Sequence, residues 1–206
     1  METAENRRPK HRDAEATKAR IFAAAAAEFA ERGLAGARVD AIAKRAEANK
    51  QLIYAYFGGK EELFAAVVGR QLEELVEEVE IDPERFAEYA GRLFDWHAER
   101  PELVRLLLYE GLMYDTGSVP NDDARTAHSR DKVKAVRAQQ KQGGMDATLD
   151  PRDLVMLVIA LATATDAMPQ LARMIEGGDP RAPRARARRR AAVVEIVRRA
   201  ATPSSS

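Results

Sequence analysis

Three consecutive residues, Lys50, Gln51 and Leu52, have side chains that suit the reading of base edges in duplex DNA. Lysine and glutamine form hydrogen bonds with base edges in the major groove, and an apolar side chain such as Leu52 contacts the methyl group of thymine. Each of the two polar residues is also common at an exposed helix start, so these residue types alone leave an ordinary solvated surface as the alternative.

Three neighbouring residues suit phosphate oxygens. Tyr54 and Tyr56 carry hydroxyls, and Lys60 places an ammonium group at a predicted helix start, where anions are favoured. The alternative for the two tyrosines is a partly buried aromatic pair. Together with residues 50–52, this set predicts a surface that binds the backbone and the bases of DNA.

A helix-turn-helix is the element that would position these side chains, because its second helix enters the major groove while the first braces it. A first short helix over residues 39–46 is predicted from apolar residues at positions i, i+3, i+4 and i+7, namely Val39, Ile42, Ala43 and Ala46. Residues 47–49 form the turn, and Asn49 is placed to cap the next helix. Ile53 and Phe57, one turn apart, give residues 50–57 their buried face.

The rest of the chain predicts an all-α fold of about nine helices, since no strand pattern competes. Residues 1–16 are predicted to be a disordered basic arm, Thr17 to cap a helix that Gly33 ends, and residues 60–80 to form a linker helix. Residues 81–201 are predicted to form a second domain. Its helices are expected over residues 82–100, 101–113, 123–142, 151–175 and 184–201, with Asp82-Pro83 starting the first and Pro169 kinking or interrupting the fourth.

The predicted helix-turn-helix, from Val39 to Lys60, resembles the DNA-binding signature of the TetR family of bacterial repressors. The resemblance rests on Val39-Asp40-Ala41-Ile42-Ala43-Lys44-Arg45-Ala46, Asn49-Lys50-Gln51-Leu52-Ile53-Tyr54-Ala55-Tyr56-Phe57 and Lys60-Glu61-Glu62-Leu63, with Ile21, Ala25, Phe29, Gly33 and Gly36 upstream. It covers roughly residues 17–68. It implies a homodimeric repressor, paired through its last two long helices, that leaves a palindromic operator when a small-molecule effector binds the second domain.

The sequence departs from the family pattern in three places. Arg38 and Val39 stand where a threonine or serine often caps the second helix and touches phosphate; the cap is lost, but the guanidinium of Arg38 can still meet a phosphate. Asp40 is acidic near the expected DNA backbone, and Glu47 replaces the usual glycine of the turn. The departures concern the details of DNA contact and leave the class of partner unchanged.

A ligand pocket in the second domain is predicted from polar side chains and adaptable methionines in an apolar setting. The candidates are Trp96, Tyr109, Met113, Met156, Thr163 and Asp166. The same composition is equally typical of a protein core. The arginine cluster of residues 184–190 is predicted to be a solvated helix start, with contact to nucleic acid or to the partner subunit as alternatives.

Composition narrows the function classes. The 206 residues include no cysteine, which excludes disulfides and thiolate chemistry. The histidines His11, His97 and His128 form no cluster in the sequence, and there is no phosphate loop or nucleophile–base pair, so neither an enzyme, a metal site nor a cofactor is expected. No apolar run has the length of a membrane span, and a cytoplasmic protein is predicted.

Charge is unevenly distributed along a chain whose net charge is zero. Residues 1–60 carry 12 basic and 8 acidic side chains, whereas residues 61–180 carry 13 and 24. A basic head on an acidic body favours one end that approaches a polyanion. An all-helical protein-binding adaptor or enzyme, or a transcriptional activator in place of a repressor, remain the alternative functions.

Overall fold

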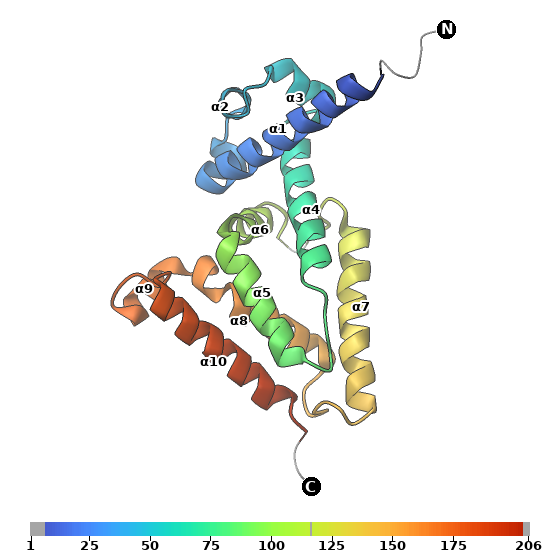
Figure 1. Cartoon of the computed structure of the whole chain (residues 1–206), viewed down its shortest axis with the longest axis vertical. Helices are drawn as coiled ribbons and strands as arrows, with labels where there is room; N and C mark the ends of the chain where they lie inside the picture. The colour runs from blue at the N-terminus through green and yellow to red at the C-terminus, as the bar shows by residue number, and fades with distance from the viewer. Residues whose placement is uncertain (1–6, 116, 204–206) are drawn as a thin grey trace.

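A computed structural model describes residues 7–115 and 117–203, and this part of the chain is all α-helical with no strand. Figure 1 shows a head, formed by the first three helices, joined by α4 to a body that holds the remaining helices. The helices are α1 (Arg7–Gly36), α2 (Val39–Arg45), α3 (Lys50–Phe57), α4 (Lys60–Glu78), α5 (Phe86–Glu99), α6 (Pro101–Tyr114), α7 (Asp122–Lys141), α8 (Pro151–Ala167), α9 (Pro169–Glu176) and α10 (Pro183–Ala201).

The core of the head forms where α1, α2, α3 and the first half of α4 converge. Its fully buried side chains include Ile21, Phe29, Ile42, Ile53, Leu63 and Phe64. The rings of Phe29 and Phe64 meet edge to face with centroids 5.2 Å apart. Each of these short helices therefore gains its stability from a shared core, because helices of seven or eight residues are marginal on their own.

The first helix begins ten residues earlier than the sequence predicts. The prediction of a disordered arm is wrong for residues 7–16, which are helical, and Thr17 lies within α1 instead of capping it; residues 1–6 lie outside the described residues. Pro9 is compatible with a helix here because it stands in the first turn. Glu15 and Lys18 add an i,i+3 ion pair of 3.0 Å. Gly33, with φ of 66°, kinks α1 near its end, as predicted for a glycine at a helix stop.

The core of the body is centred on α5, which packs between α8 and α10. Its buried side chains include Phe86, Tyr89, Leu93, Phe94, Leu154 and Val158. α5 itself begins at Phe86, later than Asp82-Pro83 suggests. The carboxylate of Asp82 accepts the backbone N–H groups of Glu84 and Arg85, both at 3.1 Å, and thus caps a turn that precedes the helix.

The predicted helix over residues 151–175 is two helices, which accounts for ten helices in the described residues where the sequence suggests about nine. Pro169 lacks the N–H that would continue the hydrogen-bond ladder of α8, and α9 starts at this residue. The start of α8 is as predicted, since Asp150 accepts the N–H of Arg152 at 2.8 Å. Within the described ranges no single helix is long and apolar enough to cross a membrane; only α8 and α9 taken together are, and they bend by 80°.

Helix α4 belongs to both parts of the molecule (Figure 1). Leu63, Phe64 and Val67 at its start are buried in the head, and Leu75 near its end is buried in the body. Leu72, between them, packs against both cores, as does Leu107 of α6. Helix α4 is therefore packed into both cores.

Candidate nucleic-acid interface and central cavity

Helix α3 is anchored through one face. Ile53 is fully buried, and the ring of Phe57 meets that of Phe22 of α1 edge to face with centroids 5.2 Å apart. The carboxamide oxygen of Asn49 accepts the N–H of Gln51 at 2.8 Å, which confirms the predicted cap. The sequence places α3 in this orientation because its two apolar anchors stand one turn apart.

The opposite face of α3 is open to solvent. Lys50 and Gln51 are exposed, and so are Leu52 (36%) and Tyr54 (46%). Tyr56 is half-buried, and the Lys18 ammonium lies 5.4 Å from the centre of its ring. The structure thus gathers the predicted base-reading residues on one exposed helix and gives Tyr56 a position at its edge.

Lys50 is not a free cation. Its Nζ lies 2.8 Å from the carboxylate of Asp40 on α2, and the pair lowers the pKa of Asp40 and raises that of Lys50. Both side chains are exposed, so water and salt weaken the attraction. Asp40, a departure from the family pattern, thereby sets the direction of the Lys50 side chain across the turn.

The turn between α2 and α3 contains a strained residue. Glu47 adopts φ of 50°, the left-handed region that a glycine occupies at lower cost. The guanidinium of Arg20 donates to the carbonyl of Ala46 at 3.1 Å and ties the turn to α1. The turn therefore keeps the geometry of a helix-turn-helix despite its glutamate.

Glu28, a residue for which the sequence predicts no role, holds the start of α2. Arg38 makes no side-chain cap, as its type predicts, and its side chain is exposed. Its backbone N–H donates to the carboxylate of Glu28 at 3.4 Å, and Glu28, which is buried, also pairs with Arg32 at 3.3 Å. An acidic side chain in an otherwise apolar helical stretch was the available signal.

Lys60 lies at the first position of α4, after Gly59. Its Nζ donates to the carbonyl of Ala37 at 3.5 Å, next to the exposed Arg38. Lys60 and the exposed Arg38 therefore both lie near the point where α1 leads into α2, at the N-terminus of α4. This arrangement suits a DNA phosphate.

The body contains a cavity of about 460 Å³ between α4, α5, α6, α7 and α8, a size common for small-molecule sites. Its apolar lining comprises Leu72, Leu75, Val76, Leu93, Leu107 and Ile159. Its polar lining includes His97 of α5 and, on α7, Arg125, His128 and Lys132.

The ionisable groups of the cavity are perturbed by burial. Burial lowers the pKa of His97 to about 4, although the carboxylate of Asp166 opposes the shift, and it also lowers the pKa values of His128 and Lys132. Both histidines are consequently neutral at pH 7. Arg125 donates to both oxygens of the buried Glu110, at 2.7 and 3.1 Å, and is paired in this way.

Comparison with known proteins agrees with this architecture. A family model described as "Bacterial regulatory proteins, tetR family" matches residues 21–67, and one described as "Tetracyclin repressor-like, C-terminal domain" matches residues 86–199. The chain belongs to the TetR family. It is thus a DNA-binding transcriptional regulator and not an enzyme, and the predicted family and fold class are confirmed.

Three relatives illustrate the range of this TetR-family likeness. The HTH-type transcriptional repressor SCO4008 of Streptomyces coelicolor is 48% identical over 167 residues, 81% of this chain and 87% of that protein. The structure of the putative transcriptional regulator SCO4942, also from Streptomyces coelicolor, aligns with a TM-score of 0.79 at 36% identity over 90% of this chain and 98% of that one. FadR of Bacillus subtilis in complex with stearoyl-CoA shares the fold, with a TM-score of 0.60 at 17% identity over 87% and 97%.

The six residues predicted for the ligand pocket of this TetR-family chain are not brought together. Thr163 lines the central cavity, whereas Asp166 lines a separate space of about 60 Å³ and pairs with Arg181 at 2.8 Å. Trp96 is buried in the core of the body, and Tyr109 packs against Gly33 of α1. Met113 (44% exposed) and Met156 (66%) face solvent.

Sequence reasoning missed most of the cavity because its lining comes from five helices. The best local signal was the pair His128 and Lys132, four residues apart on one face of α7. His97 and His128 are far apart in the sequence, but both line this cavity. Among the described residues, no group of three acidic, histidine or cysteine side chains is placed to hold a metal ion.

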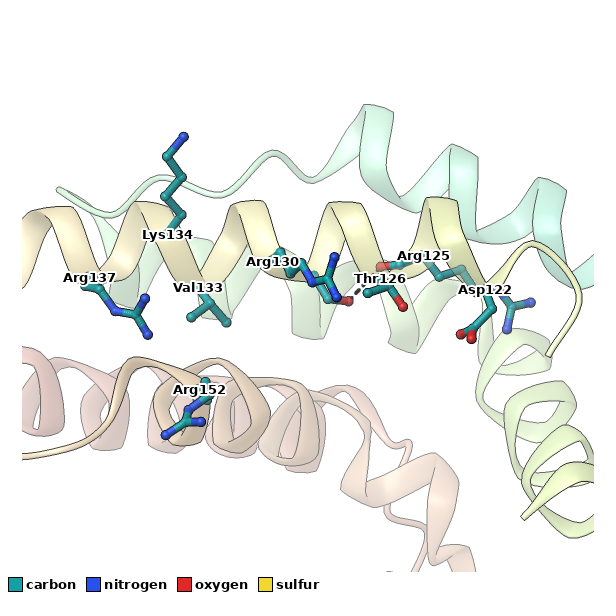
Figure 2. Close-up of a pocket in the computed structure, with 9 residues that line it drawn as sticks. Asp122, Arg125, Thr126, Arg130, Val133, Lys134, Arg137 and Arg152 are labelled. Atoms are coloured by element: carbon teal, nitrogen blue, oxygen red, sulfur yellow. Dashed lines mark hydrogen bonds between the residues drawn. The ribbon is translucent and has the colours of Figure 1, made fainter. Parts of the chain in front are cut away.

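The outer face of α7 borders a second, cationic hollow. This groove of about 540 Å³ runs between α7 and the start of α8, and Figure 2 shows Arg130, Arg137 and Arg152 beside it. Lys134 also lines the groove, and Asp122 is the acidic residue among its lining. α7, predicted as a mostly exposed polar helix, therefore separates a largely apolar cavity from a basic groove.

The arginine cluster of residues 184–190 is paired with acidic residues of its own chain. Arg190 lies 2.6 Å from Asp95, Arg186 lies 3.5 Å from Glu99, and Arg189 lies 3.3 Å from Glu176. These pairs attach α10 to α5 and α9. The cluster is thus more than a solvated helix start.

Proposed function

We propose that this TetR-family chain is a homodimeric repressor that binds a palindromic operator in the cytoplasm and leaves it when a small molecule enters the central cavity. Arg38, Lys50, Gln51, Leu52, Tyr54, Tyr56 and Lys60 are the proposed DNA contacts. The exposed side chains of α3 supply base readout, and the cations at the start of α2 and α4 meet phosphates.

The observation that carries this proposal is the shared use of α4. Leu63 and Phe64 fix its first half in the DNA-reading head, and Leu72, Leu75 and Val76 in its second half line the cavity. A ligand that enlarges the cavity shifts α4 and with it the spacing of two heads in a dimer. DNA affinity then falls, because both half-sites must be engaged at a fixed separation.

An exposed apolar surface supports dimerisation through the last helices. Met156 and Leu157 of α8 and Ile196 of α10 are each more than half exposed, and α9 adds Met174 and Ile175. Side chains of this kind are usually covered when they gather on one surface. A second copy of the chain is the proposed cover.

The cavity supports an effector of drug-like size, and FadR of Bacillus subtilis, a protein of the same fold, was crystallised with stearoyl-CoA. Its walls of leucine, valine and isoleucine offer apolar contact, and the polar groups of α7 offer orientation. Release of DNA on ligand binding follows when the ligand prefers the conformation in which the heads are misplaced.

The test is DNA binding by the full chain, measured by fluorescence anisotropy at low salt. The duplexes are the region upstream of its own gene and a set selected from random sequence. We expect a palindromic preference, a stoichiometry of two chains per site, and a changed sequence preference in Gln51→Ala. Gln142→Ala, at an exposed position of the body, serves as the control and keeps the preference unchanged.

Absence of DNA binding, combined with salt-independent binding to a protein, would identify an adaptor and refute the proposal. Higher transcription from the target promoter in the presence of the protein would identify an activator, and the repressor assignment would then be wrong.

A further inference from the structure

Three ionisable groups that the DNA-binding function does not use line the central cavity. His128 and Lys132 stand four residues apart on α7, and His97 faces them from α5. The positive charge of Lys132 contributes to the lowered pKa values of both histidines, so the three groups share one electrostatic environment. The remaining lining is largely aliphatic.

Lys132 is the uncompensated charge among these groups. Arg125 is neutralised by two hydrogen bonds to Glu110, and Glu73, the carboxylate among the described residues that line the cavity, is exposed. In the described ranges no carboxylate lies within 4 Å of the Lys132 ammonium. An unpaired ammonium beside apolar walls is unfavourable, and an anionic ligand would relieve that cost.

The two histidines leave buried nitrogen atoms without hydrogen-bond partners among the described residues. These are Nδ1 of His97, whose side chain is 2% exposed in the structure, and Nε2 of His128. A neutral imidazole carries one donor and one acceptor. A bound ligand with oxygen atoms satisfies these nitrogens, as buried polar groups in native proteins generally require.

Building on the proposed release of DNA by a small molecule, we propose that the effector is an amphipathic anion. Its anionic head pairs with the ammonium of Lys132 and accepts a hydrogen bond from Nε2 of His128. Its apolar body lies against Leu72, Leu93 and Ile159. An amphipathic cation is disfavoured, because it would meet Lys132 as a like charge.

The field around α7 favours the same sign of ligand. The helix carries six basic and three acidic residues. Arg130, Lys134 and Arg137 border the groove on its outer side (Figure 2). A basic surface of this kind raises the local concentration of anions around α7.

The experiment compares three probes of one chain length, dodecanoate, dodecanol and dodecyltrimethylammonium, each below its micelle concentration. Binding to the full chain is measured by calorimetry, and DNA release is measured on the selected duplex. We expect dodecanoate to bind most tightly and to release DNA. Lys132→Met should weaken dodecanoate binding about tenfold or more and leave dodecanol binding unchanged. Lys134→Met, on the outer side of α7, should change neither.

The outcomes separate this inference from the proposed function. Two results would overturn the inference: tighter binding of dodecyltrimethylammonium than of dodecanoate, or a change of less than twofold in dodecanoate affinity in Lys132→Met. Release of DNA by dodecyltrimethylammonium would still support a ligand-responsive regulator. Dodecanoate binding that depends on Lys132 but leaves DNA affinity unchanged would support the anion site and refute ligand-controlled release. Unchanged melting of the Lys132→Met variant shows that its effect is local.

Discussion

The head and the central cavity place their functional groups in opposite ways. In the head, the recognition residues lie on an exposed helix, and the anchor Ile53 is fully buried behind them. In the body, the polar groups point into a hollow, and three of their nitrogens, one each of His97, Arg125 and His128, lack partners among the described residues. The DNA-binding surface of the head is thus already formed, whereas the cavity contains polar atoms whose hydrogen bonds are unsatisfied. This difference implies that the head is firmly packed, whereas the body has room to accommodate a ligand.

The largest expected effect comes from removing an anchor of the head. Ile53→Ala leaves a void in a fully buried position and should lower the free energy of unfolding by about 2 to 5 kcal/mol. The neighbouring Leu52→Ala, at a solvent-exposed position, should change it by less than about 0.5 kcal/mol. Urea denaturation of both variants makes the comparison, and equal losses would show that α3 is not anchored as described.

The next effect is the pH dependence of stability that arises from the buried His97. His97 is neutral in the folded chain because burial lowers its pKa to about 4, whereas in the unfolded chain it is protonated below about pH 6.5. The unfolded state therefore binds more protons, and about 3 kcal/mol of stability is lost as the pH falls from 7 to 4. His97→Gln should remove this component. An unchanged pH dependence of urea unfolding in that variant would contradict the assignment.

A smaller effect is expected from a cation that meets phosphate. Lys60→Ala should weaken binding to all duplexes by a similar factor and reduce the slope of log affinity against log salt concentration by about one. Lys141→Ala, at the far end of α7, should leave the slope unchanged. Anisotropy titrations over a range of salt concentrations measure both. A loss confined to one DNA sequence would instead make Lys60 a base contact.

The smallest effect tests the strained turn. Glu47→Gly relieves the left-handed backbone at φ of 50° and should raise the free energy of unfolding by about 0.5 kcal/mol, after the entropy of glycine is counted. Glu47→Ala keeps the strain and serves as the control. Thermal melting is sensitive enough to rank the two variants, and equal melting temperatures would mean that the strain is unimportant.

The sequence was sufficient for the head because its information is local. The spacing of Ile53 and Phe57, the cap at Asn49 and the stop at Gly33 each act within a turn or two of helix, and all three are found as predicted. The unpredicted details are contacts between elements. The pair of Lys50 with Asp40 and the buried Glu28 at the start of α2 both depend on how helices approach one another.

The lining of the cavity was not predicted from the sequence, because it too depends on contacts between helices. Methionines and a tryptophan suggested a pocket by composition, but Met156 faces solvent and Trp96 is part of the core. The actual lining joins Gly69 to Thr163 across five helices, a result of long-range packing that no single periodicity records. Only Thr163 among the predicted residues faces it.

Leu72 and Leu107 pack against both cores, so neither core is complete without the other. The head and the body should consequently melt together in one thermal transition. Amide hydrogens of α2, far from the cavity, should then exchange more slowly when a ligand occupies the body. Ligand occupancy is in this sense a source of kinetic protection for the whole chain.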